Sequence, residues 1–355
     1  MSNASWFGAA VAVPFVAIAA GSMDDYLRQL DTKLPAGERR ILIENLIGDA
    51  EVLPAAGPDT EISATVHVAG GDEALARQTA EGIRLEADGG HVVVRYPDAR
   101  QLCALPGRST SSVDTDTDYL GRRVRVESGT TPGRCVRVDL IVRLPADREL
   151  TLKSKVGEIE ARDLKANLVL DTGNGGVSVA RHAGSLDIDT GSGSVKVDGA
   201  RGRVKVDTGS GDVDVAGIDG PVNADTGSGH VRINGNHGDV RVDTGSGDVR
   251  LQGFADGSDL DIDTGSGDVE VDGDLAPLRR LRVDTGNGNI NVVTHTATSL
   301  RLVADSGSGR VTIDVAGAQV EQKDPTHAQA TLGTGAGRAR LDAGSGRIEF
   351  HQRTH

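Results

Sequence analysis

Residues 204–221 read VKVDTGSGDVDVAGIDGP, and this stretch decides the fold. Val204 and Val206 alternate with a lysine, and Val213 and Val215 alternate with aspartates. Alternation with a period of two predicts a strand that has one buried face and one exposed face. The sequences DTGSG and AGIDGP follow the two strands, so each strand is predicted to end in a glycine-rich turn.

The same unit recurs along the chain at nearly constant spacing. Seven D-T-G motifs and one D-S-G motif are separated by 18, 18, 18, 18, 20, 21 and 21 residues. Their aspartates are Asp171, Asp189, Asp207, Asp225, Asp243, Asp263, Asp284 and Asp305. One unit is too small to bury its own apolar face, but stacked units bury it together. The period therefore predicts a β-solenoid with coils of about 18 residues.

The details of the stack also follow from the repeat. Each strand is expected to pair in register with the same strand of the next coil, and the glycines let turns stack at strand spacing. Asp and Thr of the motif are expected to bond turn N–H groups. The longer late spacings come from inserts, FADGSDL at 254–260 and DLAPLRRL at 274–281. Near the C-terminus, GTGAGRARL from Gly333 and DAGSGRIEF from Asp342 start nine residues apart, half a coil.

The section before the repeats has a different pattern. Residues 39–57 look like a worn copy of the coil. Strands are predicted for EISATVHVA, HVVVRY, RRVRVES and CVRVDLIVRLP, a short helix capped by Asp72 for EALARQTAEGI, and a polar loop for 109–118. The predicted fold is all-β, with an antiparallel cap over 31–150 that contains one helix and a solenoid over 151–350. The cap is expected to shield the first coil, and residues 320–330, with Lys323 and Pro325, to blunt the far edge.

Residues 1–22 are predicted to be a signal peptide or an apolar anchor. Trp6 to Ala20 is an apolar run that is short for a transmembrane helix, and Ala17-Ile18-Ala19 has the spacing of a signal-peptidase site. No basic residue precedes the run, so cleavage after residue 19 and retention as an anchor both remain open. The segment predicts export to the periplasm or cell envelope. Membrane contact is expected only through this segment, if it is uncleaved.

Two cysteines, Cys103 and Cys135, occur without a C-x-x-C motif, which disfavours zinc-ribbon and thioredoxin-like sites. In an exported protein they could form a disulfide, whereas in the cytosol free thiols are expected.

The formal net charge of −14 disfavours nucleic acid as a partner, because nucleic-acid binding needs a basic face. An acidic surface instead keeps an extended protein soluble and separate from its copies, so we expect a monomer.

The aspartate column permits two further interpretations. D-T-G is the motif of aspartic proteases, but those enzymes need two facing carboxylates, and in-register aspartates point the same way. Alternatively, calcium could offset repulsion along a ridge formed by Asp189, Asp207, Asp225, Asp243 and Asp263. The calcium-binding G-G-x-G-x-D repeat is not matched, so N–H bonding within the turn is favoured. We therefore expect no catalytic residues, no metal site and no cofactor, with calcium as the alternative.

Units of the form V-x-V-D-T-G-S-G-D-V-x-V, preceded by ILIENLIGDAEVLPAAG, resemble the bacterial DUF4097 family of candidate adhesins, which is similar to head-GIN-domain proteins. The resemblance covers about residues 31–350. It implies an envelope-associated, non-enzymatic β-solenoid and supplies no catalytic residues.

The first functional hypothesis is therefore an adhesin or structural module that contacts an unknown protein or glycan of the cell surface. Alternatives are a self-assembling envelope scaffold, a regulator linked to envelope stress and, least favoured, a polysaccharide-acting enzyme. The irregular parts, residues 61–150 and the inserts near Phe254 and Pro277, are expected to carry specificity.

Overall fold

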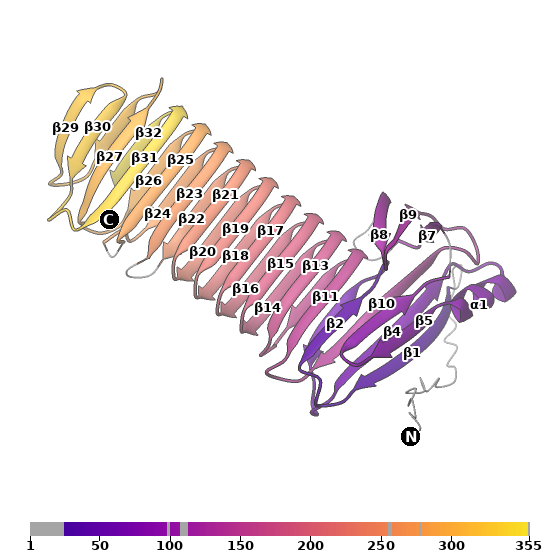
Figure 1. Cartoon of the computed structure of the whole chain (residues 1–355). Coiled ribbons are helices and arrows are strands. Elements are labelled where there is room, and N and C mark those ends of the chain that lie inside the picture. Colours follow the sequence, from indigo (N-terminus) through magenta and orange to yellow (C-terminus); the bar gives the residue numbers. More distant parts are fainter. Residues whose placement is uncertain (1–24, 98–99, 107–112, 255–257, 277, 354–355) are drawn as a thin grey trace. The chain divides into compact units, whose positions relative to one another are not determined.

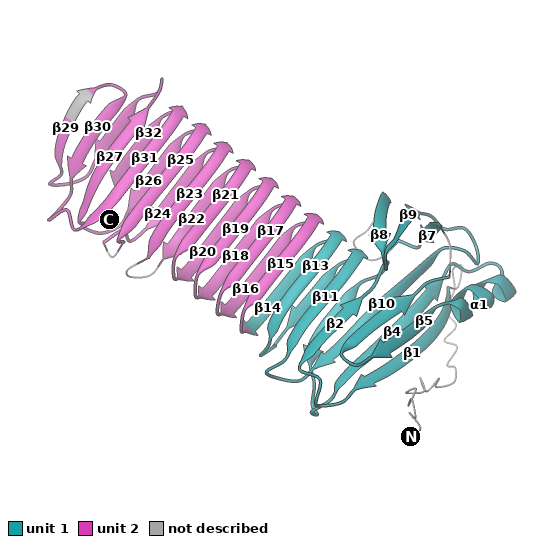
Figure 2. Cartoon of the chain, in the orientation of Figure 1, with its two compact units in different colours: residues 1–182 teal, residues 183–355 magenta. Residues whose placement is uncertain are grey.

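The computed structural model describes residues 25–97, 100–106, 113–254, 258–276 and 278–353 (Figure 1). The predicted signal peptide or anchor, and parts of both late inserts, lie outside the described residues. The chain divides into two compact units, residues 1–182 and 183–355 (Figure 2). The division falls beyond residue 150, because unit 1 keeps coils that pair with its cap strands. The predicted domain bounds stay predictions.

Unit 1 begins with β1 (Tyr26–Leu34), β2 (Arg40–Glu44), β3 (Ala50–Pro54), β4 (Thr60–Val68), α1 (Glu73–Gly82), β5 (Arg84–Asp88) and β6 (His91–Arg95). It continues with β7 (Gln101–Ala104), β8 (Asp114–Tyr119), β9 (Arg122–Ser128), β10 (Val136–Leu144), β11 (Glu149–Val156), β12 (Ile159–Arg162), β13 (Asn167–Asn174) and β14 (Val177–Ala183).

The worn copy at residues 39–57 is a true coil of the solenoid. Its strand β2 pairs in parallel with β11, and β3 pairs in parallel with β12. The opposite edges of β2 and β3 pair with β6 and β10. The cap strands therefore cover this first coil inside unit 1, as the sequence predicts.

The cap itself is mostly antiparallel, with pairs β1–β4, β4–β10, β5–β6 and β8–β9. Helix α1 is where the sequence predicts it, and the Asp72 side chain accepts a hydrogen bond from the Leu75 N–H at 3.0 Å. At the other end of the helix, Arg28 on β1 donates to the carbonyl oxygens of Ala80 and Ile83 at 2.6 and 3.0 Å. These bonds fasten the helix to the edge strand of the sheet.

The prediction of a loop over residues 109–118 is wrong for its second half. Asp114 to Tyr119 form β8, which pairs antiparallel with β9. The alternation explains the strand: Thr115 and Thr117 are partly buried, Tyr119 is buried, and the intervening aspartates are exposed. β-Branched and aromatic residues on one face outweigh the polar composition that favours a loop.

Unit 2 consists of strand pairs that form coils. The strands are β15 (Leu186–Ser192), β16 (Val195–Arg201), β17 (Val204–Ser210), β18 (Val213–Asp219), β19 (Val222–Ser228), β20 (Val231–His237), β21 (Val240–Ser246), β22 (Val249–Phe254), β23 (Asp259–Ser266), β24 (Val269–Gly273), β25 (Arg280–Asn287) and β26 (Ile290–Thr294). The last strands are β27 (Leu300–Ser306), β28 (Val311–Asp314), β29 (Gln319–Asp324), β30 (His327–Thr331), β31 (Gly337–Ser345) and β32 (Ile348–Gln352).

From β15 to β26 each strand pairs in parallel and in register with the matching strand one coil away. For example, Val204 lies opposite Leu186 and Val222, and Val213 lies opposite Val195 and Val231. The alternating valines point inward and are almost fully buried. The core of unit 2 is thus a set of aliphatic columns between two sheets, which explains why so few aromatic residues are needed.

The motif residues play other roles than the sequence predicts. Thr226 is buried, and its hydroxyl donates to the carbonyl oxygen of Gly211 in the preceding coil at 3.3 Å. The equivalent bonds of Thr208, Thr244, Thr264 and Thr285 measure 3.0–3.4 Å. The motif is therefore the end of a strand, and its threonine ties one coil to the next instead of bonding a turn N–H.

The aspartate that follows the motif supplies the turn bonds. Asp212 accepts the N–H of His230 at 2.9 Å, and Asp248 accepts the N–H of Asp268 at 2.9 Å. Asp268 accepts the N–H of Asn289 at 2.7 Å. Each of these three carboxylates therefore caps the next coil.

The second glycine of the motif has no room for a side chain. A Cβ atom added to Gly229 would lie 2.0 Å from the Gly211 carbonyl oxygen, and one added to Gly247 would lie 2.0 Å from that of Gly229. The turns can stack at strand spacing only if this position carries hydrogen alone.

The order of coils in space departs from the order in the chain at the end of unit 2. Strand β31 lies between β25 and β27, and β32 lies between β26 and β28. The last coil is therefore inserted between two earlier ones, which corrects the expectation that each coil pairs with its successor. The hairpin β29–β30 makes this possible, because it carries the chain past β27 and pairs antiparallel with it.

Candidate functional site

The largest hollow that we find in unit 1 lies among residues 95–125. Its volume is about 920 Å³. We call it the arginine groove, and its lining residues are Leu46, Arg95, Tyr96, Pro97, Arg100, Leu102, Asp116, Tyr119, Leu120, Arg122, Arg123, Val124 and Arg125. Five arginines and one aspartate in the lining of a chain with a net charge of −14 make this hollow unlike the rest of the surface.

Two of the three tyrosines of the chain hold the groove in shape. The Tyr96 hydroxyl donates to Asn45 Oδ1 at 2.7 Å and accepts the Ile47 N–H at 3.2 Å. The Tyr119 hydroxyl donates to the Val94 carbonyl oxygen at 2.6 Å. Burial raises the pKa of both hydroxyls far above the usual range, so both stay protonated. The rings meet edge to face, with centroids 6.1 Å apart.

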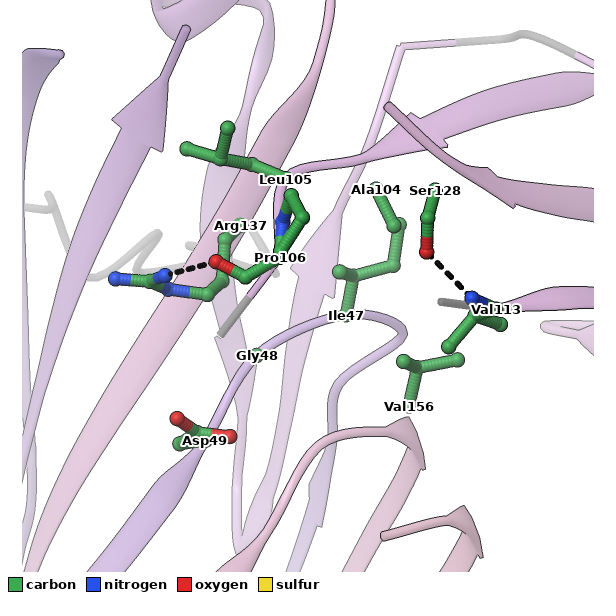
Figure 3. Close-up of a pocket in the computed structure, with 10 residues that line it drawn as sticks. All are labelled: Ile47, Gly48, Asp49, Ala104, Leu105, Pro106, Val113, Ser128, Arg137 and Val156. Carbon is green, nitrogen blue, oxygen red and sulfur yellow. Dashed lines mark hydrogen bonds between the residues drawn. The ribbon is translucent and has the colours of Figure 1, made fainter. Parts of the chain in front are cut away.

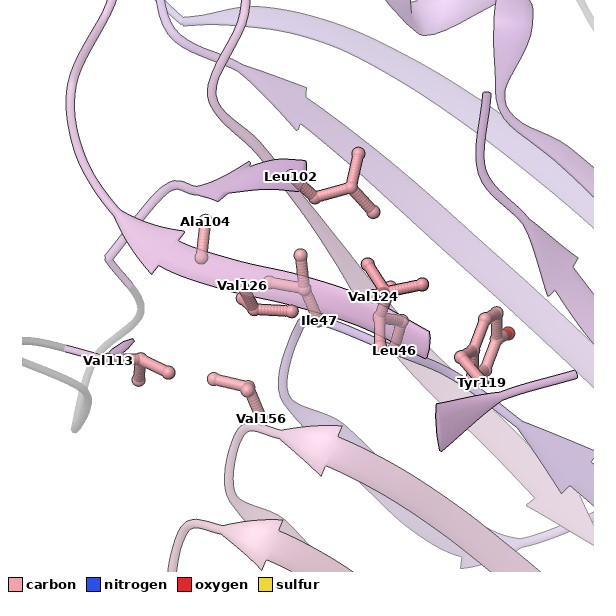
Figure 4. Packing of buried hydrophobic residues seen from close by; sticks show 9 residues of the cluster. All are labelled: Leu46, Ile47, Leu102, Ala104, Val113, Tyr119, Val124, Val126 and Val156. Carbon is pink, nitrogen blue, oxygen red and sulfur yellow. The ribbon is translucent and has the colours of Figure 1, made fainter. Parts of the chain in front are cut away.

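The floor of the groove is apolar and continuous with a buried cluster. Figure 4 shows this cluster, which consists of Leu46, Ile47, Leu102, Ala104, Val113, Tyr119, Val124, Val126 and Val156. Leu46, from the turn of the first coil, packs there with Val124 of β9, and Leu120 packs against the cluster from the β8–β9 turn. The groove therefore combines a charged rim with an apolar floor.

The arginines of the rim differ in how they are engaged. Arg95 pairs with Glu86 at 2.8 Å, and Arg123 pairs with Asp116 at 3.3 Å. Arg125 pairs with Asp114 and Glu127 at 3.0 and 2.6 Å. Arg100 is exposed and forms no ion pair or side-chain hydrogen bond with any residue that the structure describes.

Strand alternation separates the three arginines of β9 into two sets. On β9, Arg122 has the parity of Val124 and Val126, which are buried against the floor. Arg123 and Arg125 have the opposite parity and meet the aspartates of β8. Arg100 immediately precedes β7 and lies beside β9, where its carbonyl oxygen accepts the Arg125 N–H at 2.9 Å. Arg100 and Arg122 therefore both lie on the side of these strands that carries the residues of the floor.

A second polar cluster in unit 1 is structural. Asp139 on β10 pairs with Arg137 and His67 at 3.0 and 3.2 Å, and it accepts the Asp49 N–H at 3.0 Å. Burial alone would raise the pKa of Asp139, but the His67 hydrogen bond and the Arg137 charge outweigh it and hold that pKa below its usual range. The Arg137 guanidinium also donates to the Pro106 carbonyl oxygen at 2.7 Å.

The hollow beside this cluster is small (Figure 3). Its volume of about 10 Å³ is that of a single water-sized probe, so it has no room for a larger ligand.

The aspartate column of unit 2 lies in register, as the sequence predicts. Asp207 lies opposite Asp189 and Asp225, and Asp243 lies opposite Asp225 and Asp263. Partial burial, then the charges of Asp207 and Asp243, raise the pKa of Asp225 above its usual range. No group of three or more metal-binding side chains occurs in the described part of the chain. Calcium binding by this ridge stays a prediction.

The D-T-G motifs do not form a protease-like pair of carboxylates. Parallel in-register strands place successive aspartates side by side on the outer face, while each threonine points inward. The structure therefore gives this motif a role in stacking.

Cys103 on β7 and Cys135 before β10 form a disulfide with a Cα–Cα distance of 4.4 Å. It joins the strand that borders the groove to the main cap sheet. The lining of the groove was not identified from sequence, although RRVRV at 122–126 and the two tyrosines lie in the irregular section 61–150 that was expected to carry specificity. Alternation within that strand was the available signal, but it cannot show which strands meet.

A second hollow lies on the outer face of unit 2, and its charges differ from those of the arginine groove. It has a volume of about 410 Å³ over β16, β18, β20 and β22. Arg232 there pairs with Asp214 at 3.5 Å and Arg250 pairs with Glu270 at 2.6 Å. Its arginines are therefore balanced by acidic residues of neighbouring coils.

The family model described as Toastrack DUF4097 matches residues 121–254 and 238–350. A comparison with curated proteins found no match. Among the described residues, no helix has the length and apolarity needed to cross a bilayer.

Solved structures with a detectable likeness include a candidate lipid binding protein and a candidate adhesin, both from Parabacteroides distasonis. The first is 9% identical with a TM-score of 0.37, covering 91% of this chain and 96% of that one. The second is 12% identical with a TM-score of 0.35, covering 92% of this chain and 98% of that one. At such values the names describe those proteins only.

Proposed function

Since the chain belongs to the Toastrack DUF4097 family, we propose that it is a non-enzymatic interaction module of the bacterial cell envelope. The observation that carries the proposal is the arginine groove. A rim of arginines around an apolar floor, set in an acidic chain, is a combination that folding alone does not require. Unit 2 supplies a regular support, and unit 1 supplies the binding site.

An exported location is supported by the Cys103–Cys135 disulfide, because disulfides persist in oxidising compartments. The partner is a component of the cell surface, and a protein or glycan that presents an anionic group joined to an apolar group would fit the groove.

The test is cosedimentation of the purified full chain with envelope fractions of a bacterium. The double variant Arg100→Glu/Arg122→Glu is compared with Arg134→Glu/Arg39→Glu, which makes the same charge change at exposed positions outside the groove. We expect saturable binding that the groove variant loses and the control retains. Absence of binding by the wild-type chain, or equal binding by both variants, would overturn the proposal.

The self-assembling scaffold remains a second candidate because of one observation. Val320 on the edge strand β29 is 44% exposed, and an edge strand presents N–H and C=O groups with which another chain can pair. Sedimentation velocity over a concentration series separates the two candidates. A monomer at every concentration excludes the scaffold.

A further inference from the structure

The chemistry of the groove also narrows the class of ligand. We propose that the arginine groove binds a small amphiphilic anion. In this ligand one phosphate, sulfate or carboxylate group is joined to an apolar group about the size of an aromatic ring system. This inference rests on the proposed function, since it names the ligand of the same site.

The anionic group is assigned by the arginines. Guanidinium groups bind phosphate, sulfate and carboxylate through paired N–H donors, and such bonds are about twice as strong as neutral ones. Arg100 has its donors available, because it makes no ion pair with any described residue. Arg122 lies on the same side of the β7–β9 sheet as the floor, and Arg95, the last residue of β6, also lines the groove. These side chains converge on one hollow from three segments.

The apolar body is assigned by the floor. Leu102 and Val124 are less than 9% exposed and belong to the buried cluster (Figure 4). Leu120 is only partly buried against that cluster. The tyrosine hydroxyls are already used inward, so the rings offer edges and carbon atoms to the hollow and no free hydroxyl. A volume of about 920 Å³ is within the range of small-ligand sites, at roughly 300–1,000 Å³.

The long-range field of the chain does not oppose such a ligand. Charges farther than about 8 Å from an ion are largely screened at physiological ionic strength. A single local anion therefore responds to the arginines beside it, whereas a long polyanion would also meet the acidic remainder of the surface. This favours a small ligand with one acidic group over nucleic acid or an extended acidic polymer.

The experiment is isothermal titration of the full chain with three probes: naphthyl phosphate, inorganic phosphate and naphthol. Naphthyl phosphate supplies both features, and the other two supply one each. We expect naphthyl phosphate to bind at least tenfold more tightly than either single-feature probe. Sulfate and carboxylate analogues of naphthyl phosphate then show which anion is preferred. Equal affinity for inorganic and naphthyl phosphate would overturn the proposal, because it would show an adventitious ion only.

Two variants assign the binding to the groove. Arg100→Glu/Arg122→Glu should weaken naphthyl phosphate at least tenfold, while Arg134→Glu/Arg39→Glu should leave it unchanged. Leu120→Asn tests the apolar wall in a turn where φ is +51°, a conformation that asparagine tolerates. It should weaken naphthyl phosphate severalfold and leave inorganic phosphate unchanged. Circular dichroism melts confirm that each variant is folded, and unaltered affinity in a folded groove variant would place the ligand elsewhere.

The outcome is separable from that of the proposed function. Envelope binding that depends on the groove, without binding of naphthyl phosphate, would remove the ligand class and leave the module. Binding of the probe without any envelope binding would support the ligand class and remove the envelope role.

Discussion

The coils of unit 2 and the strands around the arginine groove are built on opposite plans. In β15–β26 the coils make nearly the same contacts as their neighbours, with a buried threonine and a stacked glycine. At the position after the motif, Asp212, Asp248 and Asp268, or His230 in one coil, accept an N–H of the next coil. Around the groove, β6, β7, β8 and β9 come together once, through tyrosines and a disulfide that have no counterpart in the coils. A residue in a coil must fit against the equivalent residues of the coils on both sides, whereas a residue at the groove must fit only its own few contacts.

The largest expected effect tests the constraint of repetition. Gly229→Val should destabilise unit 2 by about 4 kcal/mol or more, because the new Cβ atom would lie 2.0 Å from the Gly211 carbonyl oxygen and force the coils apart. Urea unfolding followed by circular dichroism measures the loss. Gly217→Ala is the control: its nearest neighbours lie 3.8 Å away and φ is +64°, so it should cost only about 1–2 kcal/mol. If both substitutions lowered the free energy of unfolding equally, the close stacking of the coils would not be the reason that Gly229 is required.

The next largest loss of stability is expected in the strands around the arginine groove. Cys103→Ser/Cys135→Ser should destabilise unit 1 by about 3–4 kcal/mol, since the disulfide closes a loop with a sequence separation of 32. Hydrogen exchange should show faster opening in β7–β10 and unaltered protection in β15–β26. Equal loosening of both regions would show that the two parts unfold as one and would weaken the contrast drawn above.

A smaller effect tests the bonds that tie coil to coil. Thr226→Val keeps the shape of the side chain but leaves the Gly211 carbonyl oxygen without its hydroxyl partner, so unit 2 should lose about 1–2 kcal/mol. Ser228→Ala, on the same strand but exposed, should change the free energy of unfolding by less than about 0.5 kcal/mol. Thermal melts measure the stability of both variants. If Thr226→Val did not change the stability, the threonines would contribute by packing alone and not through their hydrogen bonds.

The smallest effect has the opposite sign. Asp225→Asn should stabilise unit 2 at neutral pH by about 0.5 kcal/mol, because it removes a charge from the aspartate column. The pKa of Asp225 is raised in the folded state, so the carboxylate is destabilising above that pKa and the penalty disappears as pH falls through it. The advantage of the variant should therefore shrink in acid. A gain that persists unchanged at low pH would mean that charge repulsion is not its cause.

Calcium enters this last comparison as well. If the ridge binds the ion, added calcium should stabilise the wild-type chain more than Asp225→Asn, and a chelator should cancel the difference. No shift in the melting temperature with either reagent would remove the ridge from consideration.

The features of the fold that repeat along the chain could be predicted from the sequence. Val204, Val206, Val213 and Val215 gave the strands, the coil length and the buried face, because one pattern was repeated many times. The role of Thr226 was missed, since a hydrogen bond to a glycine 15 residues earlier depends on the stacked coil and cannot be read from local turn chemistry.

The groove could not be assembled from the sequence for a related reason. The strand at 122–128 was predicted, but its partners were not: β8 was taken for a loop, and the parallel contact with β7 has no local signature. Long-range pairing of unlike strands is decided by packing, so only the folded chain shows that Arg100 and Arg122 line the same hollow.

Because the last coil is inserted between two earlier coils, the coils of unit 2 cannot all stack in the order in which they are synthesised. Strands β27 and β28 leave the ribosome before β31 and β32, which are their partners in the finished stack. Most coils can dock as soon as they emerge, onto a neighbour that is already in place. The β27–β28 coil must either wait or pair temporarily with β25–β26 and later give way. The distal end of unit 2 is therefore completed by one late step, and during that interval two unsatisfied edges are exposed to proteases, to chaperones and to other nascent chains.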